Sequence, residues 1–141
     1  MLEVEVFGTQ LALDAPVRAT VLRLCTAAAA SAGIEDGHLA IEYVDQERIA
    51  QLNAEHRGKV GPTDVLSFPI DGAAPIDGPT RELGDVVICP EHTRDLREAI
   101  VHGVLHLVGM DHERDGGEML ALQAELLARE SQESQESREP R

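Results

Sequence analysis

Short segments of alternating or continuous apolar residues predict the β-strands of this chain. Leu2, Val4 and Val6 alternate with glutamates, which is the two-residue period of a strand that packs one face against a core. The run that ends before Pro90 is apolar almost throughout, as expected of a buried strand. Four strands are predicted, at residues 2–7, 38–44, 65–68 and 83–89.

The segments between and after these strands predict helices. Asp14 is a candidate N-cap with Pro16 in the first turn, and apolar residues follow at helical spacing until Gly33. Asp45 is expected to cap the next helix, which runs to about residue 56. From Glu91 the chain is expected to be helical up to a segment with three histidines. A last helix is expected after residue 115.

The order of these elements predicts the fold class. The order βαβαββαα indicates an α+β domain with a small mixed β-sheet of about four strands covered by helices, in which the histidine-bearing helix crosses the core. The 141 residues fit a single domain. We expect residues 1–130 to form this domain and the Ser-Gln-Glu-rich residues 131–141 to be a disordered polar tail.

Apolar segments and cysteines in the sequence predict the cellular compartment of the protein. No stretch of about 18 apolar residues could span a membrane, and the N-terminus lacks the basic and apolar regions of a signal peptide. Cys25 and Cys89 each lie among apolar residues, which favours reduced core thiols over a disulfide. We therefore expect a cytoplasmic protein.

The net charge of −14 limits how the chain could bind a nucleic acid. Phosphate binding depends on Lys and Arg, and the chain has one lysine against 26 acidic residues. A large basic surface is therefore excluded, and any contact with RNA must be local. Arg57 and Lys59 are close neighbours and are candidates for such a contact.

Three histidines within eleven residues have the spacing of metal ligands. His102 and His106 are four residues apart, so they lie on one face of a helix and can present ring nitrogens to one ion. Gly109 tolerates the left-handed conformation that ends a helix, and the reversal could return His112 as a third ligand. Three imidazoles leave one tetrahedral position for water, which is typical of catalytic rather than structural zinc.

The histidine spacing is also that of a class of zinc proteases, the metzincins. In those enzymes the residue after the first histidine is a glutamate that takes a proton from the zinc-bound water. Gly103 occupies this position here. Without that carboxylate the metal-binding motif is retained, but peptide hydrolysis is not expected.

Three ordered motifs and Arg57 carry a resemblance to a known family. The motifs are Pro-Thr-Asp-Val-Leu-Ser-Phe-Pro at 62–69, Gly-Asp-Val-Val-Ile-Cys-Pro at 84–90 and the histidine motif. With these features the chain resembles the YbeY family of bacterial endoribonucleases, also called rRNA maturation factors, from about residue 52 to 126. The resemblance implies a zinc-dependent, single-strand-specific endoribonuclease that acts in 16S rRNA 3′-end maturation and ribosome quality control.

The resemblance also implies roles for particular residues and a set of partners. His102, His106 and His112 would bind one Zn²⁺ per chain, and Arg57 would be catalytic. Single-stranded RNA, rRNA and the ribosome or its small-subunit proteins would be the partners, with no membrane involved. The chain departs from the family in two places, since Met110 replaces the usual tyrosine and the segment before His102 is shorter. The shortening implies that the helix normally preceding the histidine helix is truncated or merged with it.

The residues alone leave several alternatives open. Asp64 and Asp111 fit either a role near the metal or substrate, or local hydrogen bonds to the backbone. Ser67 could contact substrate. Besides the endoribonuclease, the motif permits another zinc metallohydrolase, or a non-catalytic zinc-bearing protein associated with the ribosome. The last is disfavoured because structural zinc usually has four protein ligands.

Overall fold

Four strands and four α-helices form within residues 1–138, the part of the chain that the structure, a computed structural model, describes; side chains are described as far as Gln135. The strands are β1 (Leu2–Phe7), β2 (Gly37–Tyr43), β3 (Val65–Pro69) and β4 (Glu82–Ile88). The helices are α1 (Arg18–Ala30), α2 (Gln46–Arg57), α3 (Leu96–Leu107) and α4 (Glu118–Arg138), with 3-10 turns at Thr9–Leu11 and Pro90–His92.

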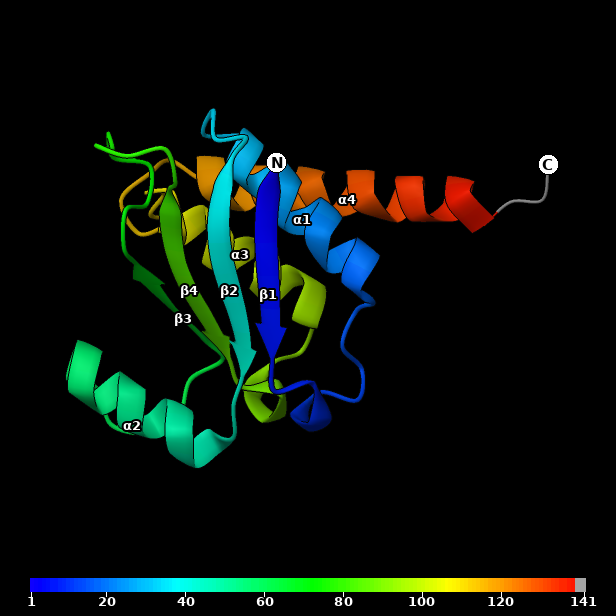
Figure 1. Cartoon of the computed structure of the whole chain (residues 1–141). Coiled ribbons are helices and arrows are strands. Elements are labelled where there is room, and N and C mark those ends of the chain that lie inside the picture. The colour runs from blue at the N-terminus through cyan, green and yellow to red at the C-terminus, as the bar shows by residue number, and fades with distance from the viewer. Residues whose placement is uncertain (139–141) are drawn as a thin grey trace.

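The strands form one mixed sheet in the order β1-β2-β4-β3. β1, β2 and β4 are parallel, and β3 pairs antiparallel with β4 at one edge. Helices α1, α3 and α4 lie together behind the sheet, and α2 lies apart from them, at the end of the sheet where β4 ends and β3 begins (Figure 1). The predicted α+β class with a four-stranded mixed sheet is therefore confirmed.

The alternation of side chains along the strands divides the core into two clusters. On one face, alternate residues of β2 and β4 such as Ile41 and Val86 pack with residues of α1, α3 and α4. On the other face, Val87 packs with Leu66 of β3 and with the apolar side of α2. Helix α3 has seven buried residues, including both faces of its middle turns, as predicted for a helix that crosses the core. Within residues 1–138, none of the helices is long and apolar enough to cross a membrane.

Two helix starts differ from the expectation. Helix α1 begins at Arg18 without a side-chain cap, so Asp14 does not cap it. The reason is Pro16, because a proline disfavours the helical conformation of the residue before it and the helix can start only afterwards. Helix α3 begins at Leu96, where the Asp95 carboxylate accepts hydrogen bonds from two N–H groups of the first turn. The shortened segment before α3 thus contains a single 3-10 turn at Pro90–His92, and it is not α-helical from Glu91 as expected.

The C-terminal segment also differs from the expectation. Disorder was predicted from Ser131 to Arg141, but α4 continues to Arg138. The segment from 131 to 138 contains no glycine or proline, and its glutamates, glutamines and arginine are good helix formers that extend an anchored helix. The remaining residues, 139–141, lie outside the described part of the chain. The division into a domain of residues 1–130 and a tail stays a prediction.

A buried carboxylate connects the three helices behind the sheet. Glu130 of α4 is only 5% exposed. Its carboxylate accepts hydrogen bonds from Arg23 of α1 at 3.0 and 3.1 Å and from Arg97 of α3 at 3.1 Å. Arg97 also donates to Ser131, which fixes the beginning of the C-terminal segment. The ion cluster therefore joins three helices that are far apart in the sequence.

We expect Glu130→Ala to lower the free energy of unfolding by about 2 kcal/mol. Removing one partner of a buried ion pair costs about 3–5 kcal/mol, and the cost is smaller here because the two arginines are about a third exposed and can be solvated. Urea denaturation of both the variant and the parent measures the difference. Glu125→Ala is the matched control on the same helix, because Glu125 is exposed and its pair with Arg129 should contribute less than about 0.5 kcal/mol. Equal effects of the two substitutions would contradict the structural role of Glu130.

Candidate metal centre

Helix α3 lies close against the sheet because it has a glycine at the contact. A Cβ added to Gly103 would overlap the side chain of Val86 on β4. The carbonyl of Gly103 accepts a hydrogen bond from the Ser67 hydroxyl of β3 at 2.8 Å. Position 103 thus faces the sheet. The close contact with Val86 explains why this position has a glycine, where the metzincin proteases have a glutamate. This hydrogen bond attaches α3 to the edge strand β3. The hydroxyl of Ser67 therefore has a structural role.

The end of α3 has the hydrogen bonds of a Schellman motif. The N–H of Gly109 donates to the carbonyl of His106, and the N–H of Met110 donates to that of Leu105. Gly109 has a φ of 101°, which a residue with a Cβ rarely adopts. The predicted helix end at this glycine is therefore confirmed. The reversal brings His112 back beside the last turn of α3.

The three histidines come together at this reversal. The ring centroids of His102, His106 and His112 are 4.7 to 5.4 Å apart. One ligand atom from each lies within 4.8 Å of the others, so the group could hold a metal ion. The Nε2 atoms of His102 and His106 are 3.1 Å apart, close to the roughly 3.4 Å between two nitrogens at tetrahedral zinc.

Hydrogen bonds determine which ring nitrogens of the first two histidines face the centre. The Nδ1 of His102 is 2.9 Å from the amide oxygen of Gln123 on α4, and the Nδ1 of His106 is 2.9 Å from the carbonyl of Met110. Both partners are acceptors only, so both Nδ1 atoms must carry the proton. The two Nε2 atoms of the neutral rings are then lone-pair donors that face one another.

The donor set fits a cation. Two unprotonated nitrogens at 3.1 Å repel each other unless a positive charge lies between them. A proton is disfavoured, because burial and the neighbouring His102 lower the pKa of His106 below its ordinary value of 6.5. The Nδ1 of His112 is buried and has no hydrogen-bond partner in the described part of the chain. Three nitrogen ligands of this kind suit zinc and other borderline-soft divalent ions.

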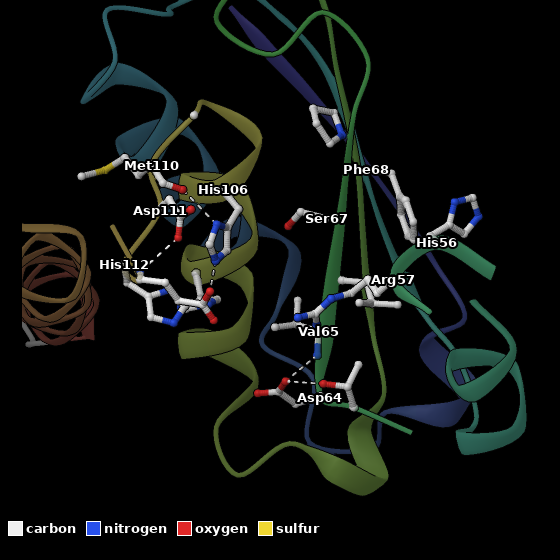
Figure 2. Close-up of a pocket in the computed structure, with 16 residues that line it drawn as sticks. His56, Arg57, Asp64, Val65, Ser67, Phe68, His106, Met110, Asp111 and His112 are labelled. Atoms are coloured by element: carbon white, nitrogen blue, oxygen red, sulfur yellow. Dashed lines mark hydrogen bonds between the residues drawn. The ribbon is translucent and has the colours of Figure 1, made fainter. Parts of the chain in front are cut away.

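Arg57 lies across an open cleft from the histidines. It is the last residue of α2, and Gly58 ends the helix in the left-handed conformation with a φ of 65°. The Arg57 side chain is exposed and points into the cleft towards the wall that carries His106 and His112 (Figure 2). The cleft has a volume of about 860 Å³, and Arg57 and all three histidines line it. The structure thus brings the four residues singled out in the sequence to one cleft.

The two aspartates of uncertain role have local partners. The Asp64 carboxylate accepts hydrogen bonds from the N–H of Val65 at 2.8 Å and from Thr63. The Asp111 carboxylate accepts one from the N–H of Glu113 and pairs with the exposed Arg114. Both side chains border the cleft. Their hydrogen bonds are those of turn residues, and within the described residues neither carboxylate is hydrogen-bonded to a histidine ring.

Sequence reasoning missed the residues that orient the ligands. Gln123 is 8% exposed and lies on the apolar stripe of α4, four residues after the fully buried Met119. A polar residue in an apolar stripe is the signal that could have revealed it. Met110 contributes its backbone carbonyl, while its side chain packs against the core. The replacement of the usual tyrosine therefore leaves the hydrogen bond to His106 intact.

The burial of the two cysteines agrees with the prediction of reduced core thiols. Cys25 and Cys89 are both buried and unpaired with each other. Burial raises the pKa of Cys25 to about 12 and also raises that of Cys89. Neither thiol lines the cleft, so the candidate ligands of the centre are the three histidines.

Comparison with known proteins gives a consistent match over most of the chain. The family described as Endoribonuclease YbeY matches residues 7–131. A protein named Endoribonuclease YbeY from Alkalilimnicola ehrlichii is 39% identical, with 80% of this chain and 77% of the relative covered. One of the same name from Rhodopseudomonas palustris is 41% identical, with coverages of 82% and 79%. The solution structure of a Thermotoga maritima protein has a TM-score of 0.54 at 23% identity, covers 96% of this chain and 93% of its own, and shows a shared fold.

Proposed function

This chain belongs to the endoribonuclease YbeY family, and on that premise we propose that it is a zinc-dependent enzyme that cleaves single-stranded RNA. We further propose that it acts in the maturation of the 16S rRNA 3′ end and in ribosome quality control, in the cytoplasm. The observation that carries the proposal is the close approach of the Nε2 atoms of His102 and His106, 3.1 Å apart, in the cleft that Arg57 also lines.

The three histidines would hold the zinc ion, and their neighbours would keep the rings in place. Gln123 and the Met110 carbonyl fix the tautomers of His102 and His106, so both rings are oriented before an ion binds. When bound, zinc supplies a Lewis acid that neutralises charge on a phosphate oxygen and lowers the pKa of water. Neutral imidazole ligands suit this chemistry, because they leave the full positive charge of the ion in the cleft.

Arg57 would bind the phosphate that is cleaved. Its guanidinium can donate two parallel, charge-assisted hydrogen bonds to phosphate oxygens. Negative charge on those oxygens increases as the phosphodiester is attacked, so a donor already in place stabilises the transition state more than the ground state. The side chain is exposed at the end of α2, which leaves its donors available to a substrate entering the cleft. We propose Arg57 as the catalytic residue on these grounds.

The charge of the chain supports a partner that delivers the substrate. A net charge of −14 with a single lysine allows little release of counterions on binding RNA, so affinity for naked RNA should be weak. We propose that the ribosome or small-subunit proteins bring rRNA to the cleft.

A panel of substrates tests the proposed reaction. Protein of measured zinc content is incubated with a single-stranded RNA, with the same RNA annealed to its complement, with a small phosphodiester and with a peptide library. We expect cleavage of the single strand at least tenfold faster than of the duplex, and no peptide cleavage, because position 103 has no carboxylate.

Other outcomes would identify a different function. Hydrolysis of the small phosphodiester or of peptides without cleavage of RNA would indicate another metallohydrolase. A zinc-replete protein that binds ribosomes and hydrolyses nothing would indicate a non-catalytic ribosome-associated protein.

A further inference from the structure

Two aromatic rings lie on the wall of the cleft opposite the histidines. Phe68 of β3 and His56 of α2 both line the cleft, beside Arg57. Their ring centroids are 4.9 Å apart and the rings meet edge to face at 68°. Figure 2 shows this pair on the side of the cleft away from His106 and His112, with the Arg57 side chain between the two walls.

The position of Phe68 is unusual for a chain so poor in aromatic residues. The sequence has two phenylalanines, one tyrosine and no tryptophan. Tyr43 is buried in the core, and Phe7 lies on β1, at the opposite edge of the sheet from β3. Phe68 is only partly buried, although the core would gain from covering it fully. Its ring therefore contributes an apolar surface to the cleft.

The ring of Phe68 is also held in place. One side packs against the cluster formed by the apolar residues of α2 and the outer face of β3 and β4. Its strand is attached to α3 through the hydroxyl of the neighbouring Ser67. A flat apolar side chain with a fixed orientation is the arrangement on which nucleobases stack in proteins that bind single-stranded nucleic acids.

Resting on the proposed function, we infer that Phe68 and His56 form a subsite that stacks one unpaired nucleobase next to the phosphate bound by Arg57. The cleft volume of about 860 Å³ lies within the range of about 300–1,000 Å³ typical of ligand sites. The subsite gives a physical reason for single-strand preference, because a base in a duplex is already stacked and paired. Every base has a π-face, so the subsite should tolerate all four bases.

A fluorescence titration tests the subsite without depending on cleavage. Short single-stranded RNAs carry 2-aminopurine at successive positions, because this base analogue is quenched when it stacks. We expect one position to be quenched by the full-length, zinc-replete protein. Phe68→Leu should lose that quenching and bind about tenfold more weakly, within the 1–3 kcal/mol typical of one base stacked on an aromatic ring. Phe68→Tyr should retain both, and His56→Ala should show a smaller loss.

The controls separate stacking from a general loss of structure. Phe7→Leu changes the second phenylalanine of the chain, which is 49% exposed on β1, and should bind like the parent. An RNA with an abasic site at the quenched position should bind the parent more weakly and be insensitive to Phe68→Leu. Zinc content and melting temperature are measured for each variant, and the exposed His56 provides a second test if Phe68→Leu fails to fold.

Each outcome bears on the subsite separately from the RNase activity. Phe68-dependent quenching in a protein that cleaves no RNA would support the subsite and contradict the proposed function. Cleavage of single-stranded RNA without quenching at any position, or with equal affinity of parent and Phe68→Leu, would overturn the subsite and leave the proposed function intact.

Discussion

Replacing His112 by alanine should release most of the zinc from the protein. The reversal at Gly109 brings this ring within 5.4 Å of both other rings, so it is the proposed third ligand. Loss of a residue that only orients a ligand typically costs 10- to 100-fold in metal affinity. Loss of a ligand itself should cost more, on the order of a hundredfold or above. We expect about one zinc per chain in the parent and a small fraction of that in the variant.

The measurement is zinc content after dialysis, together with the melting temperature. His92→Ala is the matched control, because His92 is an exposed histidine of the 3-10 turn that contacts Gln46 and does not line the cleft. It should retain the zinc of the parent. A His112→Ala protein with full zinc occupancy would remove the argument for a third ligand after the helix end.

Replacing Arg57 by alanine should abolish most cleavage and leave the zinc in place. One charge-assisted donor to the transition state is typically worth about a hundredfold or more in rate. The side chain is exposed at the end of α2, so the melting temperature should not change. Arg57→Lys should recover only part of the rate, since an ammonium provides charge without the planar pair of donors.

Single-turnover cleavage of a labelled single-stranded RNA, with zinc content measured on the same samples, gives the result. Arg48→Ala serves as the control on the same helix, because Arg48 is exposed, contacts Gln51 and does not line the cleft. Its rate should equal that of the parent. A parental rate in metal-replete Arg57→Ala would reduce Arg57 to a surface residue.

The parts of the fold that depend on local patterns were predictable from the sequence. Strand β1 follows from the alternation of Leu2, Val4 and Val6, and Asp45 caps α2 through a hydrogen bond from Arg48 as expected. The end of α3 at Gly109 is equally local, because the positive φ and its hydrogen bonds involve neighbouring residues. The proximity of the three histidines followed from these local features.

The parts that depend on tertiary contacts were not predictable. Gly103 is needed because its helix packs against Val86, which lies seventeen positions earlier in the sequence. The hydrogen bond from Ser67 to the carbonyl of Gly103 forms only because β3 lies beside α3. No local pattern indicates either neighbour. The Phe68–His56 contact likewise forms only when the end of α2 approaches the edge strand.

The last helix contains a signal that sequence reasoning did not use. Residues 119, 123, 126 and 130 follow the spacing of one helix face, and all four are buried. Two of them, Gln123 and Glu130, are polar, and each has a specific partner: a metal-site histidine for the first and two arginines for the second. The apolar members of the stripe end at Leu126, so they predict a helix only to about residue 130.

The most direct test of the central claim is the dependence of RNA cleavage on zinc occupancy. Metal is removed from the full-length protein, zinc is restored in graded amounts, and single-turnover cleavage of a single-stranded RNA is measured at each level. The three-histidine centre predicts a rate that rises in proportion to bound zinc and reaches its maximum at one zinc per chain. A cleavage rate that remains at its full value after the metal is removed would contradict the account.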